Sequence, residues 1–277
     1  MESRPIRRPY LAGPTPLAIA HRGGGGEHPE NTMAAFAAAV ALGCTHVETD
    51  VQLTRDRVLV AFHDDSLDRV TDGHGRIADL TLAEVRHADA GYRFSPAGAG
   101  FPFRGRGLTV PTFEELLTAW PQLRVNVDAK SEATVAPLAA LIERLGATER
   151  VCAASFSDRR LRRFRRLSGG RVCTSMGSGA IARARLASLA GRMPAVGADC
   201  VQVPLAHRGI RIVDRRFVAA AHRGGLPVHV WTVDDEATME RLVDLGVDGI
   251  MTDRPSLLRE VLRRRGLWLE AAPATPA

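Results

Sequence analysis

Residues 20–64 read AHRGGGGEHPENTMAAFAAAVALGCTHVETDVQLTRDRVLVAFHD, and they hold two histidines and two carboxylates that matter for function. Glu48 and Asp50 are two positions apart in the extended segment 45–53, so both side chains point to the same face of the predicted strand. Two carboxylates on one face favour a hard cation such as Mg²⁺ or Ca²⁺ over Zn²⁺. His21 and His63 carry side chains suited to proton transfer near neutral pH. Together these residue types indicate metal-assisted cleavage of a phosphoester.

The chain as a whole alternates strand-like and helix-like segments. Short apolar runs predict eight strands, at residues 17–20, 45–53, 124–129, 151–155, 171–175, 200–203, 228–233 and 249–251. Helical patterns follow them, at residues 33–42, 113–120, 133–145, 158–167, 180–190, 214–222, 236–245 and 256–265. Eight such units predict an α/β fold, a (β/α)8 TIM barrel, with an open doubly wound sheet as the alternative.

The barrel is predicted to form a single domain over residues 16–265. Residues 1–15 form an N-terminal extension, and the Ala- and Pro-rich residues 266–277 are predicted to be a disordered tail. The periodic pattern weakens at about residues 65–110, where glycine, proline and aromatic residues gather. Long insertions in compact domains are typically functional loops or disordered segments. We therefore expect a small inserted subdomain after the second strand, folded over the mouth of the site.

Charge and hydropathy exclude several classes of partner. The 277-residue chain carries a net charge of +6, much of it in the arginine-rich segments 159–166 and 259–265, which we interpret as solvated helix faces. No aromatic residues are interleaved with these arginines, so nucleic acid is not an expected partner. No apolar run reaches the roughly 18 residues of a membrane span. Residues 1–17 lack the apolar core of a secretory signal, so no stable membrane insertion is expected.

The four cysteines are widely spaced. Cys44, Cys152, Cys173 and Cys200 show no CxxC spacing, and three of them fall on apolar, strand-like segments. This pattern favours buried free thiols over disulfides or a zinc site. Free thiols in turn favour a reducing, cytoplasmic location.

Several polar residues fall where predicted strands end. His21 follows the first strand, Asp128 and Lys130 end the third, and Trp231 lies near the end of the seventh. Active sites of such barrels lie at the C-terminal ends of the strands, so these side chains should converge on one face. Lys130 is also the single lysine among 37 basic residues. Its compact ammonium suits a tight phosphate or metal pocket better than a guanidinium would.

Motifs spread over residues 16–262 occur in the order typical of one enzyme family. The chain resembles the glycerophosphodiester phosphodiesterases in the segments His21-Arg22-Gly23, Pro29-Glu30-Asn31-Thr32, Glu48-Thr49-Asp50-Val51, Thr54-Arg55-Asp56, His63-Asp64, Leu67, Arg69, Thr71, Val110-Pro111-Thr112, Asn126-Val127-Asp128-Ala129-Lys130, Trp231-Thr232-Val233 and Gly249-Ile250-Met251-Thr252-Asp253-Arg254-Pro255. The ordered set is more specific than any one tripeptide.

The resemblance implies a role for each candidate site residue. It implies one divalent cation, Mg²⁺ or Ca²⁺ with Mn²⁺ also compatible, held by Glu48, Asp50 and Asp128. The family usually has glutamate where Asp128 stands, and related sphingomyelinase D enzymes have aspartate there. It also implies the following set: His21 as base and His63 as acid, Arg22 and Lys130 on the phosphate, and Trp231 against the alcohol group.

The reaction implied by the resemblance is hydrolysis of glycerophosphodiesters to sn-glycerol 3-phosphate and an alcohol. The nucleophile, water or a substrate hydroxyl that first closes a cyclic phosphate, stays open at this point. One alternative is a lysophospholipase D or sphingomyelinase D-like activity on lipid headgroups, with the aromatic residues of 94–103 against an acyl chain. A non-catalytic phosphodiester-binding barrel is less favoured, because the expected positions carry competent residue types. We expect a small-molecule substrate and a monomer or homodimer.

Two further tripeptides repeat the first motif. His222-Arg223-Gly224 ends a predicted helix, where basic residues suit the helix dipole and glycine suits the position after the last turn. His207-Arg208-Gly209 follows the sixth strand on the active face, which leaves a substrate contact open.

Overall fold

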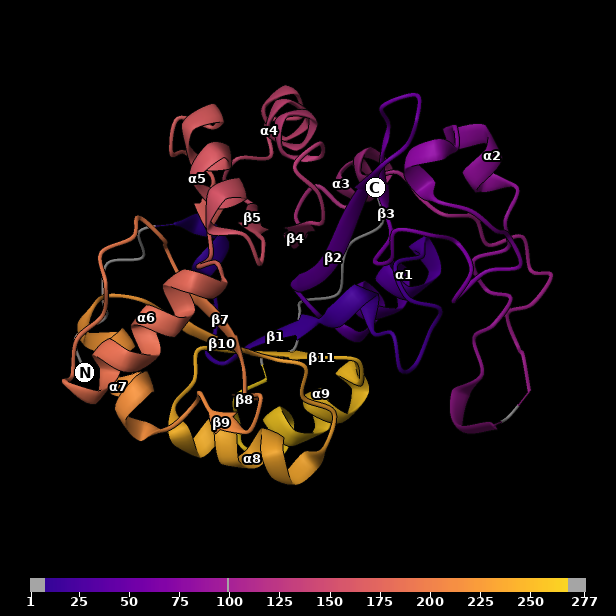
Figure 1. Ribbon diagram of the computed structural model, residues 1–277. Coiled ribbons are helices and arrows are strands. Elements are labelled where there is room, and N and C mark those ends of the chain that lie inside the picture. The colour runs from indigo at the N-terminus through magenta and orange to yellow at the C-terminus, as the bar shows by residue number, and fades with distance from the viewer. Residues whose placement is uncertain (1–7, 99, 269–277) are drawn as a thin grey trace.

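A single curled sheet organises the protein. The computed structural model describes residues 8–98 and 100–268 (Figure 1). Eight parallel strands pair in the order β6-β5-β4-β2-β1-β11-β10-β7, and the short β3 (Leu59–Ala61) pairs antiparallel with β2. The parallel strands are β1 (Leu17–Ala20), β2 (His46–Leu53), β4 (Arg124–Ala129), β5 (Val151–Ala154), β6 (Cys173–Thr174), β7 (Val201–Pro204), β10 (Val228–Trp231) and β11 (Gly249–Thr252). The predicted α/β barrel-type fold is confirmed.

The sheet curls until its first and last strands meet. β1 pairs with both β2 and β11, so strands from the two ends of the chain lie side by side. No strand pairing joins β6 to β7 within the described ranges. The backbone N–H of Asp199 donates to the Thr174 carbonyl (2.8 Å), and the Thr174 N–H donates to Asp199 Oδ2 (2.9 Å). These bonds bridge the remaining seam.

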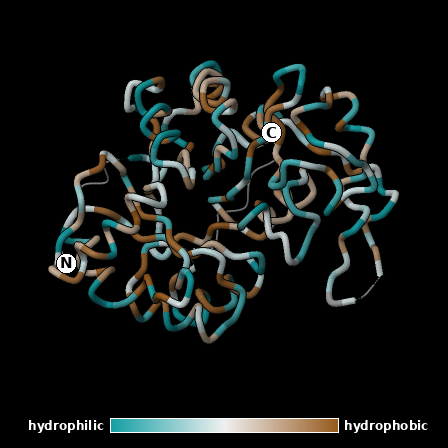
Figure 2. The backbone as a smooth tube through the Cα atoms, in the orientation of Figure 1, coloured by the Kyte–Doolittle hydropathy of each residue, from teal (hydrophilic) through white to brown (hydrophobic). Residues whose placement is uncertain are grey.

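Helices cover the outside of the sheet. They are α1 (Met33–Leu42), α3 (Phe113–Ala119), α4 (Val135–Arg144), α5 (Asp158–Leu167), α6 (Ser178–Leu189), α7 (Arg215–Arg223), α8 (Glu236–Leu245) and α9 (Pro255–Arg264). Their starts follow capping chemistry. Thr32 accepts a hydrogen bond from the Ala35 N–H, and Thr112 forms a reciprocal capping box with Glu115. The helices combine hydrophobic and hydrophilic residues to differing degrees (Figure 2), and α1 consists of hydrophobic residues alone. Their apolar faces form two large cores against the strands.

The segment between β2 and α3 forms a separate small unit. It contains β3, the 3-10 turn Ile77–Asp79, the short helix α2 (Leu82–Arg86) and a second turn at Pro96–Gly98. Its apolar residues, among them Phe62, Leu67 and Val85, form their own buried cluster. The limits predicted for the domain and its insertion stay predictions. Most of the predicted tail, residues 269–277, and residues 1–7 of the predicted extension lie outside the described residues.

One short hairpin was not predicted. β8 (Ala206–His207) and β9 (Ile210–Arg211) pair antiparallel after β7. In the described part of the chain, no helix is both long and apolar enough to cross a membrane.

Candidate active site

One cavity opens where the parallel strands end. Its volume is about 410 Å³, and its walls include all eight residues assigned from the sequence: His21, Arg22, Glu48, Asp50, His63, Asp128, Lys130 and Trp231. The predicted convergence on one face is therefore observed. The roles given to the individual residues stay predictions.

His21 lies between two carboxylates. It begins the turn after β1, and its Nδ1 lies 2.8 Å from Asp253 Oδ1. Because a carboxylate only accepts hydrogen bonds, Nδ1 must carry the proton. His21 Nε2 is thereby left facing Glu48 Oε2, at 3.7 Å. The ring orientation that acid–base chemistry needs is thus set by Asp253.

The next residue adopts an unusual backbone conformation. Arg22 has φ 52° and ψ 29°, the left-handed region that side chains other than glycine rarely adopt. This turn aims the Arg22 N–H at Glu48 Oε2 (3.1 Å) and its guanidinium at Glu30 Oε1 (2.9 Å) and Asp50 Oδ2 (3.5 Å). Backbone strain of this kind is concentrated at functional sites.

The carboxylates come from two neighbouring strands in matched register. Glu48 pairs with Asn126 and Asp50 with Asp128 across the β2–β4 ladder. All of these side chains are buried. Asn31 Nδ2 donates to Asp50 Oδ2 at 3.1 Å and so fixes one oxygen of that carboxylate.

The ammonium of Lys130 joins two of the carboxylates. Its Nζ lies 2.7 Å from Asp50 Oδ1 and 2.9 Å from Asp128 Oδ2. Asp128 Oδ1 is buried and has no hydrogen-bond partner. A buried carboxylate oxygen without a partner is unfavourable unless a cation or water meets it.

A hard divalent cation fits this set of donors. Glu48, Asp50 and Asp128 offer only oxygen ligands, the type that Mg²⁺ and Ca²⁺ prefer, and one of those oxygens is unsatisfied. Within residues 8–98 and 100–268, the three carboxylates do not bring one oxygen each within 4.8 Å of one another. The Lys130 ammonium, which contacts both Asp50 and Asp128, lies between those two carboxylates.

Burial and neighbouring charges shift the pKa values of the acidic groups in different directions. Burial and the nearby Asp50 charge raise the pKa of Glu48 to about 7. Burial also raises the pKa of Asp128. Burial would raise the pKa of Asp50 as well, but Lys130 and Arg22 outweigh it and leave that pKa lowered. Burial lowers the pKa of His21, but Glu48 and Asp253 outweigh burial and leave it raised.

His63 is held by a second carboxylate. It follows β3, and its Nδ1 lies 2.5 Å from Asp64 Oδ1. Arg69 binds Asp64 Oδ2 through Nε (2.5 Å) and both oxygens of Glu30 (2.9 and 2.6 Å). Glu30 also binds Arg22, so a continuous network joins the two predicted functional side chains His63 and Arg22.

One side of the cavity is apolar. Phe156 and Trp231 meet edge to face with ring centroids 5.7 Å apart, and Lys130 Nζ lies 6.0 Å from the Phe156 ring. Ile181 of α6 and Ile212 after the β8–β9 hairpin extend this wall. His207, left open above, also lines the cavity, whereas His222 pairs with Asp248 (2.7 Å) and is not among the lining residues. Among the described residues of 64–125, none lines the cavity, so the apolar wall does not come from the aromatic insertion.

Sequence reasoning gave no role to several residues that shape the site. Asp253, Asp64, Glu30, Arg69 and Asn31 stood in the motifs but were assigned none. Gln202 and Asn126, which were also given no role, line the cavity as a polar pair. Gln202 Nε2 donates a hydrogen bond to Asn126 Oδ1 (2.9 Å). The signal for this pair was a polar residue on each of two apolar strands.

Comparison with known proteins places the chain among its relatives. The sequence profile described as the glycerophosphoryl diester phosphodiesterase family matches residues 21–257. A Mycobacterium tuberculosis protein named "Probable glycerophosphodiester phosphodiesterase 2" is 40% identical over 262 residues, covering 91% of this chain and 92% of the relative. A crystal structure of a glycerophosphodiester phosphodiesterase from Agrobacterium tumefaciens superimposes with a TM-score of 0.71 at 26% identity, covering 87% of this chain and 97% of that one.

A further solved structure bears on the chemistry. It is a phosphodiesterase from Oleispira antarctica in complex with the product sn-glycerol-3-phosphate, with a TM-score of 0.74 and 26% identity, covering 90% of this chain and 97% of that one. The profile match spans most of the chain and the Mycobacterium relative matches it over almost its full length. The chain described here belongs to the glycerophosphoryl diester phosphodiesterase family.

Proposed function

We propose that the protein hydrolyses glycerophosphodiesters to sn-glycerol 3-phosphate and an alcohol with the help of one divalent cation. The observation that carries the proposal is a pair of histidine–carboxylate units, His21–Asp253 and His63–Asp64, whose two histidines line one cavity with the acidic and basic cluster. The product complex of the Oleispira relative supports the substrate class. Enzymes of this family are generally dependent on a divalent metal.

Glu48, Asp50 and Asp128 would hold the cation, Mg²⁺ or Ca²⁺ with Mn²⁺ also compatible. When bound, it would polarise a phosphoryl oxygen and neutralise developing charge. Arg22 and Lys130 supply further positive charge for the remaining phosphate oxygens. Lys130 would exchange part of its contact with Asp50 and Asp128 for the substrate phosphate.

Protons move through the two histidines. A phosphodiester has a poor alkoxide leaving group, so one group must protonate it while another deprotonates the attacking hydroxyl. In both histidines Nδ1 lies against a carboxylate, which leaves Nε2 as the atom that takes or gives the proton. We assign His21 as base and His63 as acid. The attacking hydroxyl belongs to water or to a substrate hydroxyl that first forms a cyclic phosphate.

A second candidate substrate is a lysophospholipid, whose headgroup would be cleaved in the same way. The apolar wall of the cavity favours it, because Trp231, Phe156, Ile181 and Ile212 offer an acyl or alcohol group a place to pack. In this proposal α6 and the β8–β9 hairpin, rather than the aromatic insertion, contact the chain.

The proposed location is the cytoplasm. All four cysteines are free and buried, as the spacing predicted, which is compatible with a reducing compartment.

The test is release of sn-glycerol 3-phosphate from glycerophosphocholine. The purified protein is stripped of metal with a chelator and then given Mg²⁺, Mn²⁺ or Ca²⁺. His21→Ala is measured beside His222→Ala, a histidine that also pairs with an aspartate but lies outside the cavity. We expect metal-restored release that His21→Ala lacks and His222→Ala keeps. No release with any metal, while lysophosphatidylcholine is cleaved, would replace the first substrate with the second.

A further inference from the structure

A second cluster of ligand-type side chains lies at the end of the barrel opposite the active site. Cys152 is the second residue of β5, Cys173 the first of β6, and Cys200 immediately precedes β7. They therefore lie at the N-terminal ends of three neighbouring strands, whereas the phosphodiesterase cavity lies at the C-terminal ends. All three side chains are fully buried, at 0 to 1% exposure. We call these residues the thiol cluster.

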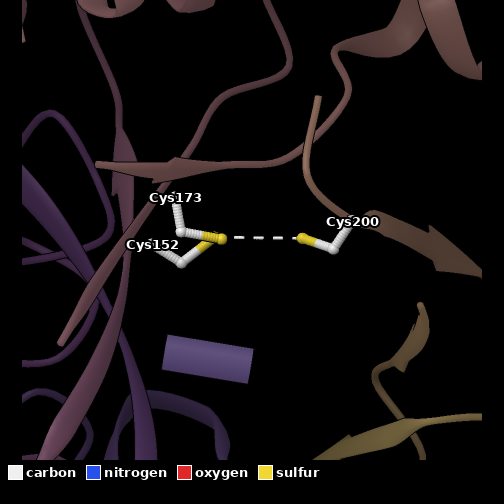
Figure 3. Close-up of side chains that lie close together, drawn as sticks. All are labelled: Cys152, Cys173 and Cys200. Atoms are coloured by element: carbon white, nitrogen blue, oxygen red, sulfur yellow. Dashed lines mark hydrogen bonds between the residues drawn. The ribbon is translucent and has the colours of Figure 1, made fainter. Parts of the chain in front are cut away.

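The three sulfur atoms converge. Figure 3 shows Cys152 and Cys173 pointing from neighbouring strands toward Cys200, which faces them. The sulfurs all lie within 4.8 Å of one another, and those of Cys152 and Cys200 are 3.9 Å apart. A cation with metal–sulfur bonds of about 2.3 Å places its thiolates roughly 3.8–4.0 Å apart in tetrahedral or trigonal geometry. An ion would therefore fit with little movement. No other three His, Cys, Asp or Glu residues in 8–98 and 100–268 meet so closely.

One buried polar atom near the thiol cluster has no partner. The Tyr10 side chain packs in the same buried group as the three cysteines, is 0% exposed, and makes no hydrogen bond through its hydroxyl. Buried polar atoms are almost always satisfied, so an unpartnered hydroxyl beside three thiols points to a missing ligand.

A positive charge lies beside the cluster. Arg165 donates to Thr174 Oγ1 (2.8 Å) and to the Ser175 carbonyl (2.7 Å), both in the residues after Cys173. These acceptors are neutral. The Asp199 carboxylate also lies close to Arg165, and its Oδ1 is bound by Arg8 Nε (2.8 Å). The guanidinium can therefore offset the excess negative charge that three thiolates and one cation would leave in the barrel.

We propose that Cys152, Cys173 and Cys200 bind one soft d10 cation, Cu⁺ or Zn²⁺, as a structural ion beneath the active site. Thiolate sulfur selects these ions over Mg²⁺ or Ca²⁺, so the two sites would not compete for metal. Each thiol that coordinates releases its proton to solvent, and the oxidation state of the metal does not change. Three donors suffice for Cu⁺, whereas Zn²⁺ would need a fourth, for which the buried and unpartnered Tyr10 hydroxyl is the candidate. Tyr10 covers this end of the barrel, so the ion would enter as the chain folds.

The experiment uses the full chain, produced in medium with added Zn²⁺ or Cu²⁺ and purified under reducing, anaerobic conditions. Bound metal is counted by mass spectrometry. Affinity is measured against chromophoric chelators of Zn²⁺ and Cu⁺, and Cd²⁺ is added to read the thiolate-to-metal absorbance band. Cys152→Ala and Cys173→Ala are compared with Cys44→Ala, which removes a buried cysteine outside the cluster. Glycerophosphocholine hydrolysis with Mg²⁺ verifies that each variant is folded.

We expect one equivalent of Cu⁺ or Zn²⁺ in the wild-type chain and in Cys44→Ala. The two cluster variants should lose at least about 100-fold in affinity and lose the Cd²⁺ band, while hydrolysing glycerophosphocholine normally. The ion that the purified wild-type chain retains, Cu⁺ or Zn²⁺, identifies the metal that the site binds. Sub-stoichiometric metal in the wild type, equal binding by the cluster variants, or a disulfide among the three cysteines after purification would each overturn the proposal. If a cluster variant fails to fold, the metal count and Cd²⁺ band of the wild type still decide it.

Discussion

His21 Nδ1 lies 2.8 Å from Asp253 Oδ1, although 232 positions separate the two residues in the chain. The contact exists because the first and last strands are neighbours: Ala20 on β1 pairs with Thr252 on β11, and each functional residue follows directly. The carboxylate fixes the tautomer and the direction of the imidazole. Asp253 is thus a positioning residue in the proposed mechanism.

Replacing Asp253 tests that role. We expect Asp253→Asn to lower kcat at least about 100-fold with little change in KM, because an amide can donate to Nδ1 as well as accept from it and so no longer fixes the proton on Nδ1. The matched control is Asp248→Asn, which alters an aspartate–histidine pair of similar length (2.7 Å, to His222) outside the cavity. Steady-state kinetics on glycerophosphocholine measures both. Equal activity of the two variants would remove Asp253 from the mechanism.

The Arg69–Glu30 bridge should matter although neither residue lines the cavity. Arg69→Gln frees Asp64 and Glu30, and through them loosens His63 and Arg22. We expect kcat/KM to fall about 10- to 100-fold with an altered pH profile. Arg144→Gln is the control. Arg144 donates two hydrogen bonds to Glu114 on the surface, with the same distances, 2.9 and 2.6 Å, as those of the Arg69–Glu30 contact. A drop of equal size in both variants would indicate a general loss of stability instead.

The unsatisfied oxygen of Asp128 predicts a metal phenotype. Asp128→Ala should raise the Mg²⁺ concentration for half-maximal activity at least about 10-fold, since one hard ligand is lost. Asp128→Glu restores the residue usual in the family and should keep that concentration within a few fold. Titration of activity with Mg²⁺ after chelator treatment measures it. An unchanged midpoint for Asp128→Ala would exclude Asp128 as a ligand.

The apolar wall predicts a split between substrates. Ile212→Asn places a polar group in the cavity wall and should lower lysophosphatidylcholine turnover about 10-fold, because the acyl chain then packs against an amide. Glycerophosphocholine turnover should stay within about twofold if its smaller alcohol does not reach this wall. Ile210→Asn, two residues away and exposed on the hairpin, is the control. The lysolipid proposal fails if the wild type and both variants cleave lysophosphatidylcholine at the same rate. It also fails if none of the three proteins cleaves it.

His46 predicts a dependence of stability on pH. Burial lowers the pKa of His46 to about 3, although the Tyr10 carbonyl, 2.9 Å from Nε2, favours the charged form. The nearby Arg124 and His229 also disfavour the charged form. The unfolded chain takes up this proton near pH 6.5, so the unfolding free energy decreases as pH falls from about 6.5 toward 3. The contribution lost at pH 5 is about 2 kcal/mol relative to pH 8.

Urea unfolding of the wild type and His46→Gln at pH 8 and pH 5 measures that loss. The difference in unfolding free energy between the two proteins should shrink by the same amount at the lower pH. His87→Gln, a substitution of an exposed histidine, is measured beside them as the control. A constant gap between wild type and His46→Gln would mean that His46 does not titrate as described.

Local patterns predicted most of the fold. The spacing of Glu48 and Asp50 on one strand predicted their common face, and the alternation of strands and helices predicted the eight parallel strands. The β8–β9 hairpin was missed because each of its strands has two residues, too few for a periodic signal. Contacts between residues that are far apart in the sequence could not be predicted from local patterns. Asp253 lies far from His21 in sequence, and only the closing of the sheet brings them together.

The thiol cluster could not be predicted from local sequence patterns either. Its cysteines are 21 and 27 positions apart in the chain, and neither spacing resembles a metal motif. The parallel register aligns Cys152 with Cys173, and the curl of the sheet brings Cys200 across from them. The sequence predicted buried cysteines without disulfides, which the structure has, but it also disfavoured a metal site because it could not show that three of them meet.

The chain contains a single lysine, and that lysine lies in the catalytic cavity, 17% exposed and between two aspartates. Covalent labelling of lysine amines is therefore a probe of one location. A reagent with a phosphate and an aldehyde, such as pyridoxal 5′-phosphate followed by borohydride reduction, would tag Lys130 when the cavity is vacant. Phosphate or product in the cavity would shield it. The fraction of tagged Lys130, read from the tryptic peptide that contains it and so separated from label on the N-terminal amine, would then report site occupancy without an activity assay.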